Sequence, residues 1–321
     1  MKIITHEDIV KLNIPAEKCF EWVEDMLKHK EEVILPPKTS IVPRDDVFYN
    51  VMPSMFPEMN YAGVKVITRE LSRKPALDSM IMLYDYETLI PKALMDGSWI
   101  TTMRTGAVAA HTISVLARKD FETVAIMGLG NTGRAAIKVL LAIYKEKKFT
   151  LKILRYKDQH LLMEEMIRGK SGEDNQNVTI QFVDSYEDVI RDSDVVISAV
   201  TFFEGTFCDN ECFKEGCLIV PIHLRGFMNC DLFFDKVYGD DTGHVKKFKY
   251  FNQFKQWAEV AQVVRGEAVG RENDQERIIA YNVGLSMHDM RFAEEVYKLA
   301  QDSIQSEVSL CPPIEKIWLD R

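Results

Sequence analysis

Three glycines within six residues are the first candidates for chemistry in this sequence. Gly128, Gly130 and Gly133 have the spacing G-x-G-x-x-G, between an apolar stretch at 123–127 and a helical apolar pattern at 133–145. In such a strand–turn–helix the first glycine makes the tight turn, the second lets the backbone approach a pyrophosphate, and the third lets helix and strand pack closely. The pyrophosphate would sit on unpaired amides at the helix start. A plain tight turn is the alternative. The predicted cofactor-binding residues of this turn are Gly128, Gly130, Asn131, Thr132 and Gly133.

The end of the next strand candidate indicates the type of dinucleotide. NAD enzymes place an acid about 20 residues past the turn, where it holds the ribose hydroxyls. Here the strand candidate 150–154 continues into Arg155, Tyr156 and Lys157. Two cations at this place favour the 2′-phosphate of NADP, unless they are simply solvated, whereas Asp158 would support NAD. We therefore predict NADP(H) as the cofactor, with NAD(H) as the alternative.

A second segment is expected beside the dinucleotide. The strand candidate 195–198 ends in Ala199, Val200 and Thr201. Ligands of open parallel sheets bind beyond the carboxyl ends of the strands, so these three residues should approach the cofactor. Packing alone would also select small residues there.

The surrounding elements indicate an α/β protein. From residue 123 strand and helix patterns alternate, which is typical of parallel strands joined by crossover helices and predicts a Rossmann-type doubly wound sheet. Residues 33–104 contain many prolines and short apolar segments, which predicts a strand-rich α+β domain. The strand candidates of the sheet are 123–127, 150–154, 178–182, 195–198, 217–220 and 236–239, and the helical patterns along the chain are 15–29, 106–118, 133–145, 161–167, 185–191 and 290–300.

Composition narrows the possible partners. The 321 residues carry a net charge of -9, so a nucleic-acid surface would need a local basic patch, and the sequence has none. The start lacks the apolar run of a signal peptide, and no stretch reaches the roughly 20 apolar residues that cross a bilayer. We expect a cytoplasmic protein that binds neither membrane nor nucleic acid. Cys208, Cys212 and Cys217 have no CxxC spacing and no nearby fourth ligand, so no metal site is predicted.

Several segments together resemble the ornithine cyclodeaminase/mu-crystallin family, in the family's order along nearly the whole chain. The segments are Pro36-Pro37-Lys38, Met52-Pro53, Gly63-Val64-Lys65, Asp96-Gly97 leading to Thr101-Thr102-Met103-Arg104-Thr105-Gly106-Ala107, the glycine turn, and Gly284-Leu285-Ser286-Met287-His288-Asp289.

The resemblance implies a homodimeric NAD(P) enzyme that acts on carbon–nitrogen bonds of small amino or imino acids. Members cyclodeaminate ornithine or lysine, dehydrogenate alanine, or reduce cyclic ketimines. Residues 1–112, completed by 290–321, would form the substrate-binding and dimerisation domain, and residues 113–289 would form the dinucleotide-binding domain.

The resemblance also implies three substrate-site residues. Arg104 looks like the family's substrate-carboxylate arginine, Lys65 looks like its active-site lysine, and Lys38 stands where many members carry an arginine. A planar guanidinium can hold an amino-acid carboxylate bidentately and fix C2 for hydride transfer. A lysine crowded by other cations can lose its proton near neutral pH and act on an imine or a water. A surface ion pair for Arg104 and a solvated strand lysine for Lys65 are the alternatives.

One position departs from the family. Aligning Asp231-Leu232 with the family's Glu-Leu pair places Arg225 where cyclodeaminases and related dehydrogenases carry a catalytic aspartate. His223 precedes it by two residues, on the same face if the strand continues, and titrates in the range for general acid–base work. A structural histidine is the alternative. Together Lys38, Lys65, Arg104 and Arg225 would give a basic substrate pocket.

These observations predict imine or ketimine reduction as the reaction, because a preformed imine needs less proton transfer than deamination followed by ring closure. A basic pocket would favour an acidic substrate and an opine-like secondary amine as product. Ornithine cyclodeamination to proline and ammonia is the second candidate. A catalytically silent NADP-binding protein is the third.

Overall fold

The computed structural model describes residues 1–169, 174–201, 203–303 and 306–310, and it divides into two compact units. The first contains residues 1–13, 32–100 and 289–321, and the second contains 14–31 and 101–288. The predicted boundaries, 1–112 and 113–289, differ from these units because residues 14–31 and 101–112 belong to the second. The functional division of the chain stays a prediction.

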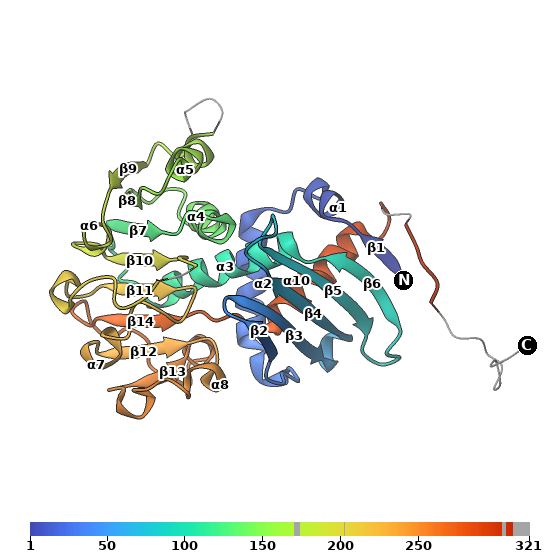
Figure 1. The fold of residues 1–321 in the computed structure, drawn as a ribbon. Coiled ribbons are helices and arrows are strands. Elements are labelled where there is room, and N and C mark those ends of the chain that lie inside the picture. The colour runs from blue at the N-terminus through green and yellow to red at the C-terminus, as the bar shows by residue number, and fades with distance from the viewer. Residues whose placement is uncertain (170–173, 202, 304–305, 311–321) are drawn as a thin grey trace, which may run out of the picture. The chain divides into compact units, whose positions relative to one another are not determined.

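A six-stranded sheet forms the first unit, in the order β1-β6-β5-β4-β3-β2 (Figure 1). Strands β2 to β6 follow one another as an antiparallel meander, and β1 pairs in parallel with β6. This sheet is the strand-rich domain predicted from residues 33–104. Its strands are β1 (Lys2–Ile4), β2 (Thr39–Arg44), β3 (Val47–Phe56), β4 (Tyr61–Arg69), β5 (Leu77–Asp85) and β6 (Pro91–Asp96), with helix α1 (His6–Lys11) after β1.

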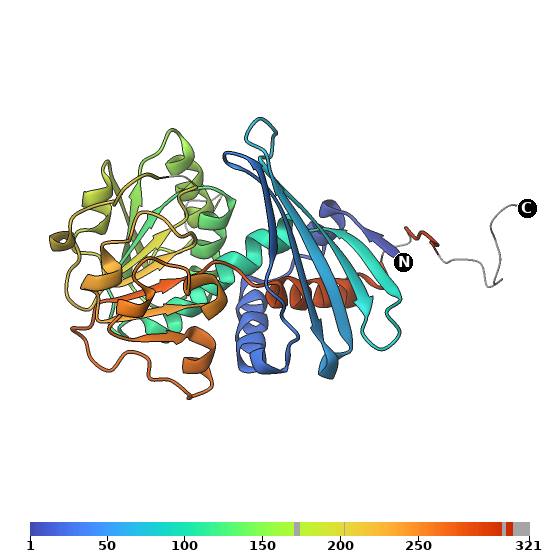
Figure 2. The same ribbon diagram turned by 60° about the horizontal axis from the view of Figure 1, so that its bottom comes forward.

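Helix α10 (Ser286–Ala300) runs along one face of this sheet (Figure 2). Side chains alternate between the faces of a strand, and Lys65 and Ile67 of β4 point to the covered face, where both are buried. Gly63, on the same face, leaves room for the helix, because a side chain there would collide with the sulfur of Met290. The predicted return of the last helix to the first domain agrees with this packing.

The second unit holds an eight-stranded, entirely parallel sheet in the order β13-β12-β14-β11-β10-β7-β8-β9 (Figure 1). Four central strands are buried along their whole length, as expected when helices cover both faces of a parallel sheet. The Rossmann-type prediction is therefore confirmed. The strands are β7 (Thr123–Met127), β8 (Phe149–Leu154), β9 (Val178–Val183), β10 (Val195–Ser198), β11 (Leu218–Pro221), β12 (Lys236–Gly239), β13 (Trp257–Glu259) and β14 (Ile278–Tyr281).

The five helical patterns predicted between residues 15 and 191 form helices of the second unit, whereas its three short helices after residue 229 were not predicted. The largest difference concerns α3, which begins at Ser98 rather than at residue 106 because the carboxylate of Asp96 accepts a hydrogen bond from the Ser98 amide at 2.9 Å. Within the described parts of the chain no helix is long and apolar enough to span a membrane. The helices are α2 (Ala16–Lys28), α3 (Ser98–Leu116), α4 (Asn131–Ile143), α5 (Gln159–Arg168), α6 (Tyr186–Ile190), α7 (Cys230–Phe233), α8 (Thr242–Val245) and α9 (Val260–Val264).

The sheet differs from the prediction at one side. All six predicted strands form, but β12 does not pair with β11, because β14 lies between them. Strands β13 and β14 were missed. They have three and four residues, too few to show a period, and a short apolar run does not distinguish a strand from a buried helical turn.

Candidate functional site

The glycine turn joins β7 to α4 and has the geometry of a phosphate cradle. Gly128 adopts φ 87°, and a side chain there would collide with the backbone of Ala199. A side chain at Gly133 would collide with the carbonyl oxygen of Gly128, whereas one at Gly130 would meet no atom of the described residues within 4 Å. Gly128 and Gly133 are thus required for close backbone packing, whereas Gly130 faces open space. That space lies at the start of a 13-residue helix, so the site fits a pyrophosphate.

The segment after β10 lies directly on this turn. The amide of Ala199 donates to the carbonyl of Met127 at 2.8 Å, and the Ala199–Val200 peptide fills the place where a Gly128 side chain would be. Thr201 follows and is exposed. Ala199 and Val200, two of the three residues predicted to approach the dinucleotide, therefore pack against the glycine turn.

Arg155 follows β8 and forms an ion pair that the sequence did not suggest. Its Nη1 lies 2.9 Å from both carboxylate oxygens of Asp184, which follows β9. Its guanidinium carbon lies 5.3 Å from the centre of the Phe182 ring. Lys157, with φ 48°, places Nζ 5.1 Å from the ring centre of Tyr156. Both predicted cations are exposed at the carboxyl end of β8, where a dinucleotide's adenosine ribose would lie.

His223 is held by Ser198 at the ends of two adjacent strands. Its Nε2 lies 2.6 Å from the Ser198 hydroxyl, and its Nδ1 accepts from the Arg225 amide at 3.3 Å, so Nε2 carries the proton of the neutral ring. Burial, assisted by the charge of Arg225, lowers the pKa of His223 to about 4. The expectation that His223 titrates near neutrality was wrong, because the ring is largely shielded from water.

The expectation that β11 continues to Arg225 was also wrong. The strand ends at Pro221, and residues 222–225 form a series of bends that leaves Arg225 exposed. Asp231, used to align this region, is buried and accepts a hydrogen bond from the Tyr281 hydroxyl at 2.6 Å. Burial raises the pKa of Asp231 to about 6, although the Tyr281 hydrogen bond opposes the rise.

Arg104 lies on α3 and is only 5% exposed, so the alternative of a surface ion pair does not hold. Its guanidinium packs against the Cα of Gly284, where an added side-chain carbon would lie 2.5 Å from Nη1. Gly284 has φ 98°, and its amide donates to the carboxylate of Asp240.

Asp240 anchors this corner of the second unit. Burial would raise the pKa of Asp240, but His244, the Gly284 amide and the charge of Lys30 outweigh it and hold the pKa below its usual value. Buried Lys30 donates to the Asp240 carbonyl at 2.8 Å and to the Glu259 carboxylate at 2.6 Å. Lys30 therefore links Asp240, the residue after β12, to Glu259 at the end of β13, and Asp240 in turn binds the Gly284 amide.

Lys65 lies on β4 in the first unit, with its Nζ 2.6 Å from the carboxylate of Asp289 on α10 and both side chains 0% exposed. The identified neighbour is a carboxylate, and the expected crowding by cations stays a prediction. Complete burial of Lys65 excludes the alternative of a solvated strand lysine. Lys38 lies just before β2 and is half-buried.

Comparison with known proteins bears on what these residues do together. Residues 2–303 match the ornithine cyclodeaminase/mu-crystallin family. The chain belongs to this family. The predicted membership is thus confirmed, and with it an enzyme that is an NAD(P)-dependent oxidoreductase or amino-acid cyclodeaminase.

Three relatives illustrate the range of the family. The nodulation efficiency protein NfeD of Rhizobium meliloti is 26% identical over 311 residues, which are 93% of this chain and 95% of the relative. The N-((2S)-2-amino-2-carboxyethyl)-L-glutamate dehydrogenase of Staphylococcus aureus is 27% identical over 238 residues, covering 69% of this chain and 68% of the relative. The Thermococcus litoralis Δ1-pyrroline-2-carboxylate reductase, solved with NADH and L-proline, has a TM-score of 0.84 and 25% identity, with 96% of this chain and 100% of that chain covered.

The predicted site residues of this family member are divided between the units. Lys38 and Lys65 belong to the first, and Arg104, His223 and Arg225 belong to the second, as do the predicted cofactor-binding residues. Their convergence on one substrate stays a prediction.

Sequence reasoning missed the partners of these residues. Asp289 was quoted only as part of the family segment, although an acid in the first turn of a helix is a visible signal. Asp184 is the second residue after the strand candidate 178–182, which follows the one that leads to Arg155. Asp240 and Ser198 likewise follow or end strands. In a parallel sheet, polar residues at the carboxyl ends of neighbouring strands are the signal that would have found them.

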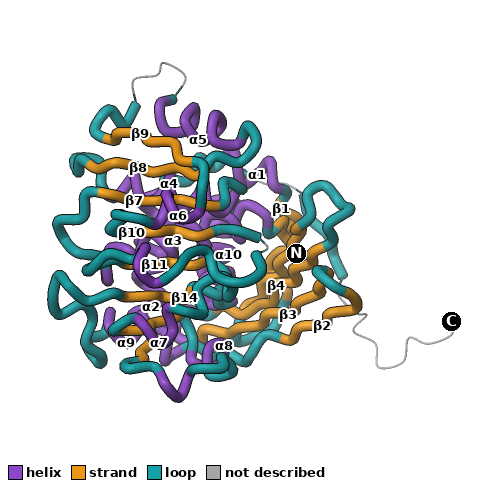
Figure 3. The backbone as a smooth tube through the Cα atoms, turned by 60° about the vertical axis from the view of Figure 1, so that its left-hand side comes forward, coloured by secondary structure: helices purple, strands orange, loops and turns teal. Residues whose placement is uncertain are grey.

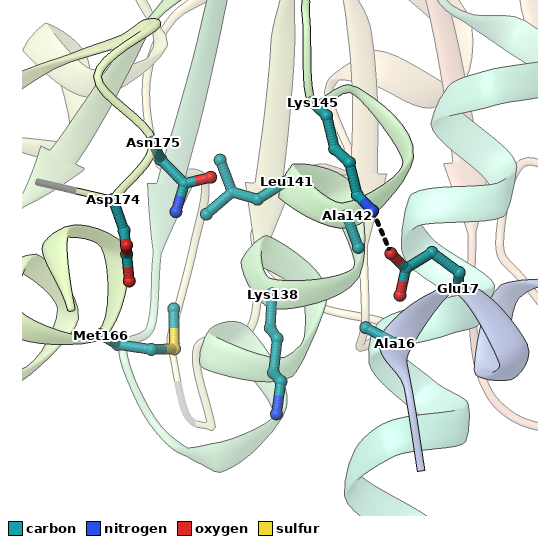
Figure 4. Close-up of a pocket in the computed structure, with 9 residues that line it drawn as sticks. All are labelled: Ala16, Glu17, Lys138, Leu141, Ala142, Lys145, Met166, Asp174 and Asn175. Carbon is teal, nitrogen blue, oxygen red and sulfur yellow. Dashed lines mark ion pairs between the residues drawn. The ribbon is translucent and has the colours of Figure 1, made fainter. Parts of the chain in front are cut away.

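A hollow of about 580 Å³ lies elsewhere on the second unit, among α2, α4 and α5 (Figure 4). It contains an ion pair between Lys145 and Glu17 at 2.6 Å. None of the residues predicted from sequence lines it. Its lining residues are Ala16, Glu17, Lys138, Leu141, Ala142, Lys145, Met166, Asp174 and Asn175.

Proposed function

We propose that this family member reduces the C=N bond of an imine derived from a small amino acid, with NAD(P)H as reductant. The observation that carries the proposal is the open cradle at Gly130 at the start of α4, in a chain of this family. Support comes from the Thermococcus litoralis relative, whose name describes reduction of a cyclic imine and whose structure contains NADH and L-proline.

The chemistry requires a hydride on the imine carbon and a proton on the imine nitrogen. A nicotinamide dinucleotide, when bound, supplies the hydride. The Arg104 guanidinium has the planar donor edge that would hold the substrate carboxylate and so fix the imine carbon. With its pKa of about 4, His223 is neutral at pH 7. It therefore acts through Ser198 as a positioning residue, and the proton comes from the protonated imine or from solvent.

The test is turnover by the purified chain. NADH and NADPH oxidation is followed by absorbance with Δ1-pyrroline-2-carboxylate and with pairs of keto acids and amines, and the amine product is identified by mass. We expect a cyclic or substituted imino acid to be reduced. Tight dinucleotide binding without turnover of any imine would instead support a silent binding protein.

Ornithine cyclodeamination is the less supported candidate. That reaction needs a carboxylate for proton transfer, and Arg225 occupies the position aligned with the family's catalytic aspartate. Incubation with ornithine and NAD⁺ or NADP⁺, followed by assays for proline and ammonia, separates the two reactions. Proline formation from ornithine faster than imine reduction would overturn our proposal.

An acidic substrate is the more specific form of the proposal. The Staphylococcus aureus relative is named for an N-substituted glutamate with several carboxylates. By residue type, Lys38, Lys65, Arg104 and Arg225 are the four cations proposed from the sequence to bind the substrate. The panel of keto acids and amines therefore includes matched neutral and dicarboxylic partners. A preference for the dicarboxylic member is expected.

We also propose NADP(H) as the preferred cofactor. Arg155 and Lys157 are exposed at the carboxyl end of β8, where a 2′-phosphate would lie. The named relative with a bound cofactor contains NADH, so both dinucleotides belong in every assay.

A homodimer is proposed from the face of the first sheet opposite α10. The register aligns Val51, Val66 and Met80 in one row, and Met80 is 56% exposed. Such an apolar face is covered in most proteins. Light scattering after gel filtration should give a dimer, and Met80→Lys should give a monomer. Ile90→Lys, at an exposed residue beyond the strands, is the control that should stay dimeric.

A further inference from the structure

Arg155 and Asp184 are neighbours because of the strand register. Strands β8 and β9 pair in parallel with Leu154 opposite Val183, so Arg155 and Asp184 each directly follow the paired ends. The Arg155 amide donates to the Val183 carbonyl at 2.9 Å and fixes the backbone there. Strand β7, which leads into the turn at Gly128, is the other neighbour of β8. Both side chains thus leave the sheet at the edge where a dinucleotide's adenosine would lie.

The guanidinium of Arg155 is held on two sides and open on a third. Nη1 donates to both carboxylate oxygens of Asp184 at 2.9 Å, and the guanidinium carbon lies 5.3 Å from the centre of the Phe182 ring. Nε and Nη2 make no hydrogen bond to any residue that the structure describes. A phosphate takes such a pair of parallel donors bidentately.

We propose that Asp184 is a specificity-determining residue for the cofactor. Its carboxylate neutralises Arg155 and repels a 2′-phosphate, and so limits the preference for NADP(H) over NAD(H). The inference rests on the proposed function, because it takes Arg155 to be the 2′-phosphate ligand. A neutralised Arg155 would let a chain with cations at this position bind NAD(H) as well as NADP(H).

The size of the effect follows from the exposure of the pair. Side chains of Arg155 and Asp184 are 44% and 76% exposed, so water and salt screen their attraction strongly. A phosphate with a charge of about -1.5 to -2 would compete effectively with a carboxylate in such a pair. Removing the Asp184 charge should therefore change affinity for the 2′-phosphate by about 3- to 10-fold.

The experiment measures the dissociation constants of NADPH, NADH, 2′,5′-ADP and 5′-AMP by calorimetry. In Asp184→Asn, NADPH and 2′,5′-ADP should bind about 3- to 10-fold more tightly, whereas NADH and 5′-AMP should change less than about twofold. The gain should shrink at high salt. Glu165→Gln is the matched control, because it removes one exposed negative charge from α5 without touching Arg155. It should leave the ratio of NADPH to NADH affinity unchanged.

The variant Arg155→Gln separates the role of Asp184 from the proposal that Arg155 binds the 2′-phosphate. It should abolish the preference for the 2′-phosphate, and Asp184→Asn should then have no further effect in the double variant. If the ratio of NADPH to NADH affinity were unchanged in Asp184→Asn but lower in Arg155→Gln, the proposed role of Asp184 would be overturned. An unchanged ratio in Arg155→Gln would overturn both this inference and the NADP(H) preference. Imine turnover is measured separately, so loss of the proposed reaction leaves these ratios interpretable.

Discussion

The carboxylate of Asp289 lies 2.6 Å from Nζ of Lys65, and neither side chain is exposed. Removing one partner of a buried ion pair leaves the other charge uncompensated, which typically costs about 3–5 kcal/mol. We expect Asp289→Ala and Lys65→Met each to lower the free energy of unfolding by this amount, measured by denaturant titration.

The double variant Lys65→Met with Asp289→Leu separates structure from catalysis. Stability should return toward that of the unsubstituted chain, because apolar side chains replace the whole pair. Turnover of the imine should not return if Lys65 acts on the substrate. Recovery of both stability and turnover would show that the pair is structural.

The glycine turn gives a second prediction, because its glycines have different surroundings. Gly130→Ala adds a methyl group to open space at a φ of -69°, which alanine adopts without strain, so the fold should be unchanged. The methyl group would stand where the pyrophosphate must approach. We expect the dissociation constant of NADPH to rise by tenfold or more while the melting temperature stays constant.

Gly133→Ala is the contrasting variant. Its methyl group would collide with the Gly128 carbonyl oxygen, so we expect the melting temperature to fall together with dinucleotide affinity. If Gly130→Ala bound NADPH as tightly as the unsubstituted protein, the turn would not be the pyrophosphate site.

Local sequence was sufficient to predict the elements around the glycine turn. The turn at Gly128, the strand before it and the helix after it are consecutive residues, and their spacing alone indicates their geometry. The predicted β8 and β10 likewise placed Arg155 and Ala199 near this turn, because parallel strands end at one edge.

The contacts between distant segments were not predictable in the same way. Strand β14 separates β11 from β12, although it follows both in sequence, and its four residues carry no signal for that pairing. The ion pair of Lys65 with Asp289 depends on α10 crossing β4 at Gly63. Shielding of His223 depends on the bends after Pro221 and on rings from other segments, such as Phe207. Its pKa could not be foreseen from residue type.

The pKa of His223 makes a third prediction. A histidine that titrates near 4 when folded and near 6.5 when unfolded stabilises the fold fully above pH 6.5, and this contribution is lost as pH falls from 6.5 to 4. The whole step is about 3 kcal/mol. In His223→Gln, whose amide can still donate to Ser198, the free energy of unfolding should depend less on pH across this window.

Activity gives a second measurement of the same ionisation. Between pH 6 and 8 the pH profile of kcat/KM should have the same shape in the unsubstituted chain and in His223→Gln, because the ring stays neutral throughout this range. A step near pH 6.5 that is lost in the variant would mean that His223 is the general acid after all.

The packing of Gly284 on Arg104 leads to the last prediction. Gly284→Ala would place a carbon 2.5 Å from Nη1 of Arg104, so the guanidinium must move. A displaced guanidinium would no longer fix the substrate carboxylate, whereas the three atoms nearest to an added Gly284 side chain all belong to Arg104 and none to the glycine turn. We therefore expect KM for the imino acid to rise by about tenfold or more, which corresponds to about 1.4 kcal/mol or more, with little change in the dissociation constant of NADPH.

Gly266→Ala is the matched control, because Gly266 also has positive φ, 74°, but a side chain there would meet no described atom within 4 Å. It carries the same type of backbone strain, about 1–3 kcal/mol, without touching Arg104. An equal rise of KM in both variants would attribute the effect to strain rather than to Arg104.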